Sequence, residues 1–111
     1  MSNAVTFDTI RSLGNASITS NYVAVGTATT VQARAVCITN STDQDMLFST
    51  DGTNNMLFVA KTSFKLFDIS ANKPDYETNA VLPKGTQFYV KYVSAPSTGS
   101  VYIEIMYGRN Q

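Results

Sequence analysis

Histidine and tryptophan are both absent from this chain of 111 residues, and cysteine occurs once. Without histidine, the chain lacks the commonest general base, the commonest metal ligand and any Ser-His or Cys-His nucleophile pair. The single cysteine, Cys37, lies in a strand-like run and is interpreted as a small buried apolar residue, not as a reactive thiol. One cysteine cannot form an internal disulfide, so an oxidised secreted scaffold is not expected. We therefore expect a protein that is not an enzyme and that takes no cofactor or small-molecule substrate.

Charge is also scarce in this chain. Charged residues make up 14% of it, against roughly 25% in an average soluble protein, and the eight basic and eight acidic residues cancel. Because nucleic acids and acidic membranes are normally bound through a basic stripe, neither is expected as a partner. The N-terminus does not read as a signal peptide, and no stretch approaches the ~20 apolar residues of a membrane span. The sequence predicts synthesis in a cytoplasm without export by a signal peptide.

Acidic residues occur in three places that raise the question of a metal or catalytic site. The runs 43–45 and 51–55 offer oxygen ligands, but neither completes a calcium-binding loop of the EF-hand type. Asp75 and Glu77 are of the type that glycosidases use as a carboxylate pair, but they lie in a Pro-containing loop that nothing places around a cleft. These acidic residues are interpreted as parts of solvated loops, so no catalytic residue and no metal ligand is predicted.

Apolar residues alternate with period two in two runs near the C-terminus, residues 86–94 and 100–107, with Pro96 and Gly99 between them. This pattern predicts a long antiparallel hairpin. One face of the second run is apolar, whereas the other keeps tyrosine and methionine, residue types that are enriched where proteins touch proteins. Because both faces carry large apolar groups, the hairpin is expected inside a sheet and not at a bare edge.

Further strands are predicted over residues 31–40, 46–49, 56–60 and 63–69. Asp51-Gly52 lies between two of these runs and predicts a tight type I′ hairpin turn. No segment of ten or more residues has the apolar spacing of an amphipathic helix. The chain is therefore predicted to be all-β, a single domain over residues 1–111 built as an antiparallel β-sandwich or jelly roll.

The N-terminal 30 residues are less regular and are interpreted as an arm leading into the first strands. Phe7, Ile10, Arg11 and Leu13 precede any convincing sheet. Because termini that are not anchored are usually polar, this segment is expected to bury its apolar groups somewhere. Two alternatives stay open: an arm that contacts a partner or a second copy, and an edge strand that closes the sandwich.

Tyrosines on the predicted strands are candidates for a contact surface. Tyr89 and Tyr102 fall on the less apolar faces of the terminal strands, where they could contact a protein partner or form part of a sugar-binding platform. The absence of tryptophan weakens the sugar-binding reading. The candidate contact residues are therefore Phe7, Ile10, Arg11, Leu13, Tyr89 and Tyr102.

Four stretches of the chain together resemble a known family. Residues 38–52 end a strand in Thr-Asn and continue to Ser-x-Asp-Gly, and residues 67–73 read Phe-Asp-Ile-Ser-Ala-Asn-Lys. Residues 82–85 read Leu-Pro-Lys-Gly, and residues 95–102 read Ala-Pro-Ser-Thr-Gly-Ser-Val-Tyr. In this order, and with the length of 111 residues, the chain resembles the capsid staple (cementing) proteins of epsilon-15-like short-tailed bacteriophages. The resembling motifs are turn residues, which serve the scaffold.

This resemblance implies a jelly-roll virion protein on the outer surface of the viral capsid. Such a protein would be made in the bacterial host cytoplasm, bind the major capsid protein, pair as a homodimer across symmetry axes and tie neighbouring capsomers together. Two other functions stay open: a head-to-tail adaptor or tail component, and a carbohydrate-binding surface module.

Overall fold

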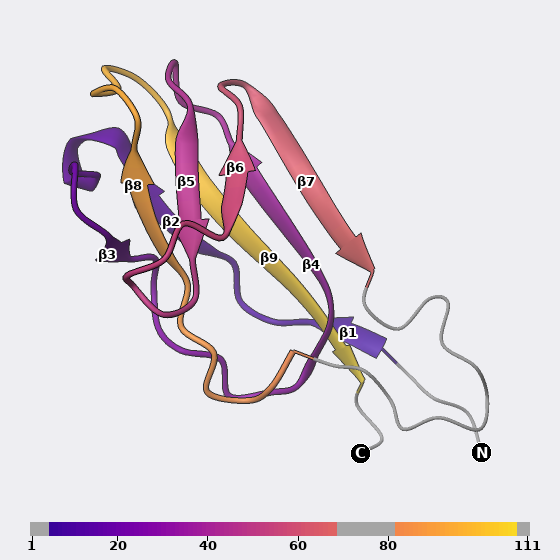
Figure 1. The fold of residues 1–111 in the computed structure, drawn as a ribbon. Helices are drawn as coiled ribbons and strands as arrows, with labels where there is room; N and C mark the ends of the chain where they lie inside the picture. The colour runs from indigo at the N-terminus through magenta and orange to yellow at the C-terminus, as the bar shows by residue number, and fades with distance from the viewer. Residues whose placement is uncertain (1–4, 69–81, 109–111) are drawn as a thin grey trace.

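Two antiparallel β-sheets lie face to face in the computed structural model, which describes residues 5–68 and 82–108 (Figure 1). Sheet A contains β1 (Val5–Phe7), β2 (Arg11–Gly14), β4 (Ala33–Asn40), β7 (Ser63–Asp68) and β9 (Ser100–Gly108). Sheet B contains β3 (Val23–Ala24), β5 (Met46–Ser49), β6 (Leu57–Val59) and β8 (Tyr89–Tyr92). The described residues include one short 3-10 helix, Asn15–Ser17, and no helix with the length and apolarity needed to cross a membrane.

The order of the strands is that of a jelly roll. Sheet A runs β1-β9-β4-β7, with β2 also beside β9, and sheet B runs β3-β8-β5-β6. When β1 and β2 are taken as one interrupted strand, the pairs are nested: β1/β2 with β9, β3 with β8, β4 with β7, and β5 with β6. Such nesting is a long hairpin rolled into two sheets. The predicted all-β, jelly-roll-like sandwich of antiparallel strands is confirmed.

The core lies between the two sheets, where alternate side chains of each central strand meet. On β9 the inward residues are Val101, Ile103 and Ile105, each at most 1% exposed. They were predicted to share one face, and they do. The residues packed with them from the other strands and loops are Ile18, Val25, Ala33, Val36, Ile38, Met46, Phe48, Val59, Phe88 and Val90. Burial of this set is the main stabilising contribution, because apolar area leaves water.

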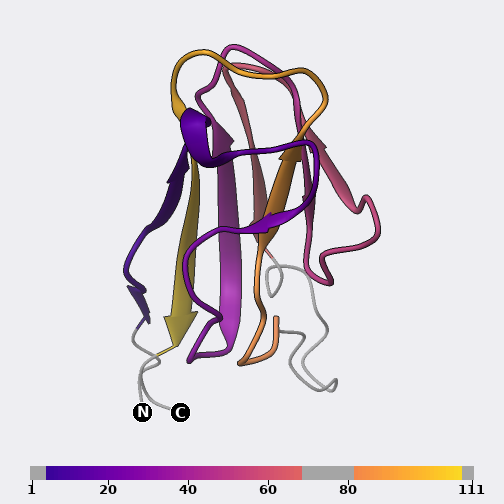
Figure 2. The same cartoon turned by 90° about the vertical axis from the view of Figure 1, so that its left-hand side faces the viewer.

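The predicted terminal hairpin is wrong, although both of its strands form. β8 pairs with β3 and β5 in sheet B, whereas β9 pairs with β1, β2 and β4 in sheet A. The connection over residues 93–99 arches from one sheet to the other (Figure 2). Two strands that face each other across a sandwich have the same alternation as two strands of one sheet, so the period alone does not separate these cases. Each strand does lie inside its sheet, flanked on both sides, as predicted.

A hairpin joins β5 and β6, but it does not use the predicted two-residue turn. The connection takes residues 50–56, and within it only Gly52 has a positive φ, at 75°. A type I′ turn needs a positive φ at both central residues, so the predicted turn is wrong. The loop is held by Asp51, whose carboxylate accepts hydrogen bonds from the backbone N–H groups of Thr53 and Asn54 at 2.8 and 2.9 Å.

Cys37 was predicted to be buried, and it is instead half-buried on the outside of sheet A. Its neighbours Val36 and Ile38 turn into the core and are 3% and 0% exposed. Because side chains alternate along a strand, Cys37 must face outward. The composition of the run indicated a strand, but it did not indicate which phase was inside.

The N-terminal residues form strands of sheet A, which was one of the two predicted alternatives. Val5 lies opposite Gly108 and Arg11 lies opposite Ile103, both in antiparallel register. The described part of the predicted arm, residues 5–13, is therefore the edge strand that closes the sandwich beside β9. The irregular stretch predicted over residues 70–79, with Asp75 and Glu77, lies outside the described residues.

Candidate protein-binding face

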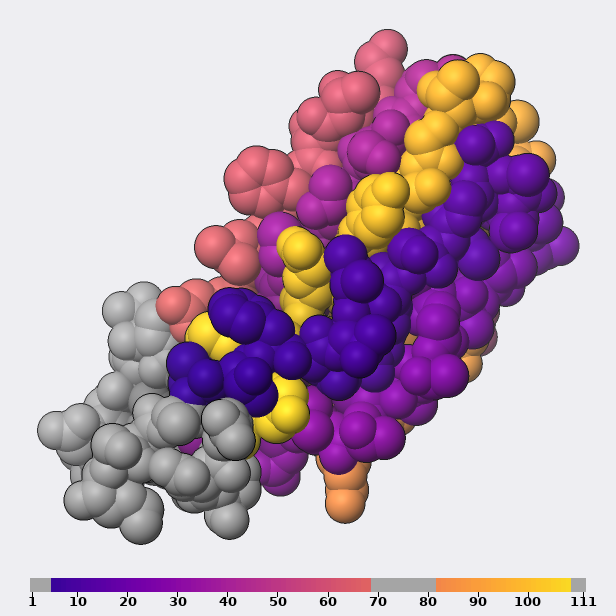
Figure 3. Space-filling model, turned by 180° about the vertical axis from the view of Figure 1, so that it is seen from behind, coloured from indigo at the N-terminus to yellow at the C-terminus, as the bar shows by residue number. Residues whose placement is uncertain are grey.

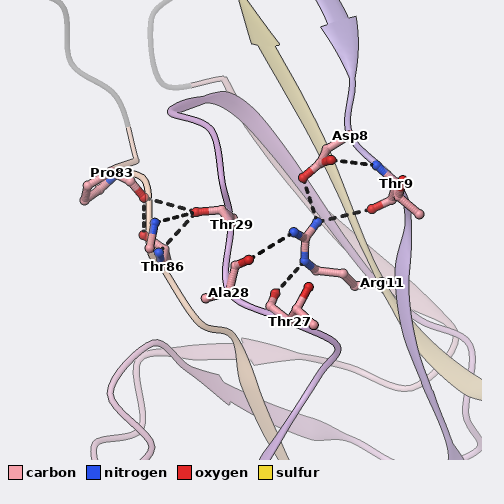
Figure 4. Close-up of polar contacts among 9 residues, drawn as sticks. Asp8, Thr9, Arg11, Thr27, Ala28, Thr29, Pro83 and Thr86 are labelled. Carbon is pink, nitrogen blue, oxygen red and sulfur yellow. Dashed lines mark hydrogen bonds and ion pairs between the residues drawn. The ribbon is translucent and has the colours of Figure 1, made fainter.

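Arg11 fixes the path of the N-terminal strands across sheet A (Figure 4). This residue is 8% exposed, and its guanidinium forms an ion pair with Asp8 at 3.0 Å. Its Nε donates a hydrogen bond to the carbonyl oxygen of Thr27 at 2.7 Å. These contacts hold the bend between β1 and β2 against the loop that follows β3. The positions of Phe7 and Ile10, on either side of Asp8, follow from that bend.

Thr29 ties the same loop to the segment that precedes β8. It is 3% exposed, and its hydroxyl oxygen accepts hydrogen bonds from the backbone N–H groups of Gly85 and Thr86 at 3.1 Å each (Figure 4). The hydroxyl also lies 3.3 Å from the carbonyl oxygen of Pro83, to which it can donate. The loop is thus held on one side by Arg11 and on the other by Thr29. This gives the N-terminal edge of sheet A a fixed support.

Three rows of outward side chains cross sheet A, and we call these residues together with Ile10 the outer face of sheet A. Taken from β1/β2 towards β7, the rows are Phe7, Met106, Ala35 and Asp68; then Glu104, Cys37 and Leu66; then Ser12, Tyr102, Thr39 and Phe64. Figure 3 shows β7, β4, β9 and the N-terminal strands side by side across this face.

Large apolar side chains on this face are open to solvent. Phe7 is 73% exposed, Phe64 is 64% exposed and Leu66 is 63% exposed. Ile10 is 50% exposed. A sheet face that is not packed on the core normally carries polar side chains, and contiguous exposed apolar patches mark interaction sites. The outer face of sheet A therefore has the character of a surface that another protein covers.

The face is hollowed over its small residues. A hollow of about 390 Å³ lies above Ala35 and Cys37. Its apolar walls come from Phe7, Ile10 and Leu66. The other lining residues are Asp8, Val36, Asp68, Glu104, Ile105 and Met106. Because small side chains in the middle are ringed by large ones, the surface is shaped to receive a protruding group.

The same hollow has acidic groups in its lining. Glu104 lies directly opposite Cys37 in the pairing of β9 with β4, and Asp68 lies opposite Ala35 in the pairing of β4 with β7. The ion pair of Arg11 with Asp8 is the one ion pair found within residues 5–68 and 82–108. Of the three acidic residues that line the hollow, Asp8 is thus neutralised, whereas Glu104 and Asp68 have no ion-pair partner among the described residues.

The structure brings together half of the residues predicted as contacts. Phe7, Ile10 and Tyr102 lie on the outer face of sheet A. Arg11 and Leu13 instead turn inward, since Arg11 is buried and Leu13 packs against the core. Their alternation with Ser12 along β2 requires this, and it leaves Arg11 as support for the face.

Tyr89 lies apart from the other predicted contact residues, because it belongs to sheet B. It pairs with Ala24 and Ser49, and its ring packs on Gly52 at 3.4 Å from the position of a Cβ there. Tyr89 and Tyr102 therefore lie on different sheets and do not share one face.

Phe64 and Leu66 are largely exposed residues of this face that sequence reasoning did not single out. They lie on β7, where the next apolar residue, Phe67, falls in the opposite phase and is half-buried. A strand with apolar residues in both phases has only one phase available for the core. The change of apolar phase between Leu66 and Phe67 was visible in the sequence, and it was the signal that one face of this strand would expose apolar side chains.

The outer face of sheet B also carries an exposed aromatic side chain, Phe58 at 44% exposure, but several of its polar groups contact one another. The hydroxyl of Tyr22 donates to the side-chain oxygen of Asn55 at 2.7 Å, and the ammonium of Lys91 lies 4.8 Å from the centre of the Tyr22 ring. Desolvation by burial raises the pKa of Tyr22, and the negative charge of Asp51 adds to that rise. These contacts satisfy the polar groups of the face among themselves.

The aspartates considered as metal ligands serve loop structure. Asp43 accepts hydrogen bonds from the Ser97 hydroxyl at 2.6 Å and from the Ser97 backbone N–H at 2.9 Å, and these bonds lower its pKa. Asp45 accepts one from the backbone N–H of Lys61 at 2.9 Å. Over the part of the chain that the structure describes, no three acidic or cysteine side chains gather as a metal site would require. Asp43 and Asp45 thus cross-link loops at one end of the sandwich.

Comparisons with known proteins bear on the fold alone. Neither a scan against protein-family models nor a search of curated proteins finds a match. A solved chain from the Bacillus endospore appendages, described as a novel family of disulfide-linked pili, has a similar structure at a TM-score of 0.51. That similarity covers 97% of this chain and 91% of the appendage chain, with 12% sequence identity.

Proposed function

We propose that this chain is a bacteriophage virion structural protein that binds the outside of the capsid and ties neighbouring capsomers together. The observation that carries the proposal is the outer face of sheet A, on which Phe7, Phe64 and Leu66 are each more than 60% exposed. A surface of this kind is covered in the working state. The resemblance of the turn motifs to capsid staple proteins supplies the identity of the proposed cover, the major capsid protein.

The mechanism is passive reinforcement. A protein that binds assembled subunits and not dissociated ones adds its binding free energy to the stability of the assembly by mass action. Each copy would pair with a second copy across a two-fold axis, where the same patch of both chains meets. Two shell contacts for each dimer raise the effective affinity without any single strong site. Neither catalysis nor a cofactor takes part in this mechanism.

The rigid support of the face fits such a role. Arg11 and Thr29 hold the N-terminal edge from below through partly buried hydrogen bonds. A surface that is ordered before binding loses less conformational entropy when a partner covers it. This smaller entropy loss applies to every copy, so its effect on the stability of the lattice adds up over many bound copies.

The proposal is tested with capsid shells prepared without the protein. The purified chain is added to intact shells and, separately, to dissociated capsid subunits, and binding is followed by co-sedimentation. We expect saturable binding to intact shells and none to dissociated subunits. The Leu66→Ser variant should lose binding and stay folded, whereas Lys61→Ser, in the β6–β7 turn, is the matched surface control. Equal binding to subunits and shells, or no binding to either, would show that the proposed function is wrong.

A second candidate is a subunit that assembles with copies of itself, as in a tail or adaptor ring. The structural likeness to a chain from disulfide-linked pili supports this second candidate. Sedimentation of the purified chain separates the two, because a self-assembling subunit forms long or ring-shaped species alone, whereas the decoration protein stops at the dimer.

A further inference from the structure

We propose that the hollow over Cys37 receives an apolar side chain of the partner protein that lies next to a lysine or arginine. The identification of that partner as the capsid protein rests on the proposed function, whereas the chemistry of the hollow does not.

The shape calls for one protruding apolar group. The hollow of about 390 Å³ is lined mainly by apolar side chains, with small residues, Ala35 and Cys37, in its centre. Phe7 and Leu66, on opposite sides, are largely exposed and free to close on an inserted group. A volume of this size is that of a small pocket, and it suits an aliphatic chain or a single aromatic ring.

The charges of the hollow call for a cation beside that group. Glu104 and Asp68 are in the lining and have no ion-pair partner among the described residues, and the lining residues within 5–68 and 82–108 include no lysine or arginine. A second copy of the same face would bring like charges together, which costs free energy at an interface. The occupant is therefore a partner with a basic residue and not the dimer mate.

A partner is not expected to add a strand to sheet A at its β7 edge, next to the hollow. β7 is the edge strand of sheet A, and Lys65 lies in its middle, exposed to solvent. A lysine on an edge strand opposes pairing with a further strand. A partner would therefore lie on the face over the hollow and would not extend the sheet.

The first test uses small probes and needs no capsid. Amide chemical shifts of the isotope-labelled chain are followed by NMR while n-hexylammonium, n-hexanol or hexanoate is added. We expect n-hexylammonium to shift the amides of Cys37, Leu66 and Glu104, and to bind about three- to fivefold more tightly than n-hexanol. Hexanoate should bind more weakly than either, because its charge repels the two carboxylates.

Two variants make the test specific. Glu104→Gln should remove most of the preference for the ammonium over the alcohol and leave alcohol binding unchanged. Cys37→Met fills the hollow and should abolish binding of both probes, whereas Cys37→Ser is the matched control that keeps the space. Equal binding of the three probes, or shifts located elsewhere on the surface, would overturn the inference.

The second test uses Cys37 as a natural reporter, because the chain has no other cysteine. The rate of its reaction with 5,5′-dithiobis(2-nitrobenzoate) is compared for the free chain and for the chain bound to capsid shells. We expect at least about a tenfold slowing when the face is covered. Binding to shells without protection of Cys37 would refute the inference and leave the proposed function standing.

Failure of the proposed function can also be told apart from failure of this inference. If the chain does not bind shells at all, the proposed function is wrong, and the NMR titration still decides the chemistry of the hollow. If Cys37 becomes protected in the concentrated chain alone as a dimer forms, the dimer mate occupies the face and the inference is wrong.

Discussion

At the scale of single residues, Gly99 lies where the β8–β9 connection passes over the end of β4. Its φ is 86°, and a Cβ at this position would overlap the carbonyl oxygen of Ser41. Gly85 has a similar φ of 91° but nothing within 4 Å of its Cβ position. We expect Gly85→Ala to lower the free energy of unfolding by about 1 kcal/mol, the cost of a left-handed backbone for alanine.

Gly99→Ala should cost more, about 3 kcal/mol, because the overlap adds to the same backbone cost. Urea unfolding of the two variants measures the difference directly. Equal losses for the two would mean that the loop shifts freely and that Gly99 is not fixed by its contact with Ser41.

The β5–β6 loop gives a prediction of pH dependence. Hydrogen bonds from Asn54, Ser49 and Thr53 hold the pKa of Asp51 well below its ordinary value of 3.8. Because the folded pKa is depressed, the contribution to stability is present above the unfolded pKa and is lost as the pH falls below it. Asp43 shifts in the same direction through its bonds to Ser97.

We therefore expect the melting temperature of the chain to fall steeply between about pH 5 and pH 2. Asp51→Asn should be less stable than the native chain near neutral pH and should show a shallower fall over that range. Melting curves recorded by circular dichroism provide the measurement. Parallel pH profiles for the two chains would mean that Asp51 does not link stability to pH.

At the scale of elements, the N-terminal strands belong to the folded domain. β1 and β2 cover one side of β9, and Leu13 packs against the core. Deletion of residues 1–13 should expose the ladder groups of β9 to pairing with other chains. We expect the truncated chain to aggregate or to melt far below the full chain. A truncated domain with a nearly unchanged melting temperature would show that the segment is a detachable arm.

Arg11 makes the attachment of these strands testable without deletion. Arg11→Ala removes the partner of Asp8 and leaves the carbonyl of Thr27 without its donor, and both contacts are partly buried. Because hydrogen bonds to a charged group are lost, we expect the free energy of unfolding to fall by about 2 kcal/mol. Ser12→Ala, at the adjacent outward position, should change the free energy of unfolding by less than about 0.5 kcal/mol. Similar losses for the two in urea unfolding would contradict the supporting role of Arg11.

The elements differ in how far the sequence predicts them. The strand predicted over residues 46–49 matches β5, and the strands over 31–40 and 63–69 match β4 and β7 within two residues. These strand predictions depend on the alternation of apolar and polar residues, which can be seen within a single run of sequence. The partner of β8 depends on the path of the loop over residues 93–99, which crosses between sheets. Loop chemistry with Pro96 and Gly99 fits either path, so the hairpin prediction failed there.

At the scale of the whole molecule, the candidate site exists only in the folded chain. Its walls come from Phe7 at one end of the sequence, Leu66 in the middle and Met106 near the other end. Nested jelly-roll pairing brings these positions into adjacent strands. Sequence reasoning located Phe7, Ile10 and Tyr102 one by one as candidates. It could not predict the hollow, because no local pattern encodes which side chains become neighbours across four strands.

The whole molecule also carries the last prediction, which concerns the particle it is proposed to reinforce. If the chain binds shells and not dissociated subunits, as proposed, it should raise the temperature at which shells release DNA as the concentration of free chain rises. The stabilisation per site grows as the logarithm of concentration over the dissociation constant, about 2.7 kcal/mol at a hundredfold excess. DNA release on heating, followed with a dye at several concentrations of added chain, measures this dependence.

The Leu66→Ser variant, at the same concentrations, should leave the release temperature at that of bare shells, because the exposed leucine belongs to the face proposed to bind the shell. Lys61→Ser should behave as the native chain. A release temperature that does not depend on concentration, or that rises equally with Leu66→Ser, would mean that the outer face of sheet A does not stabilise the shell.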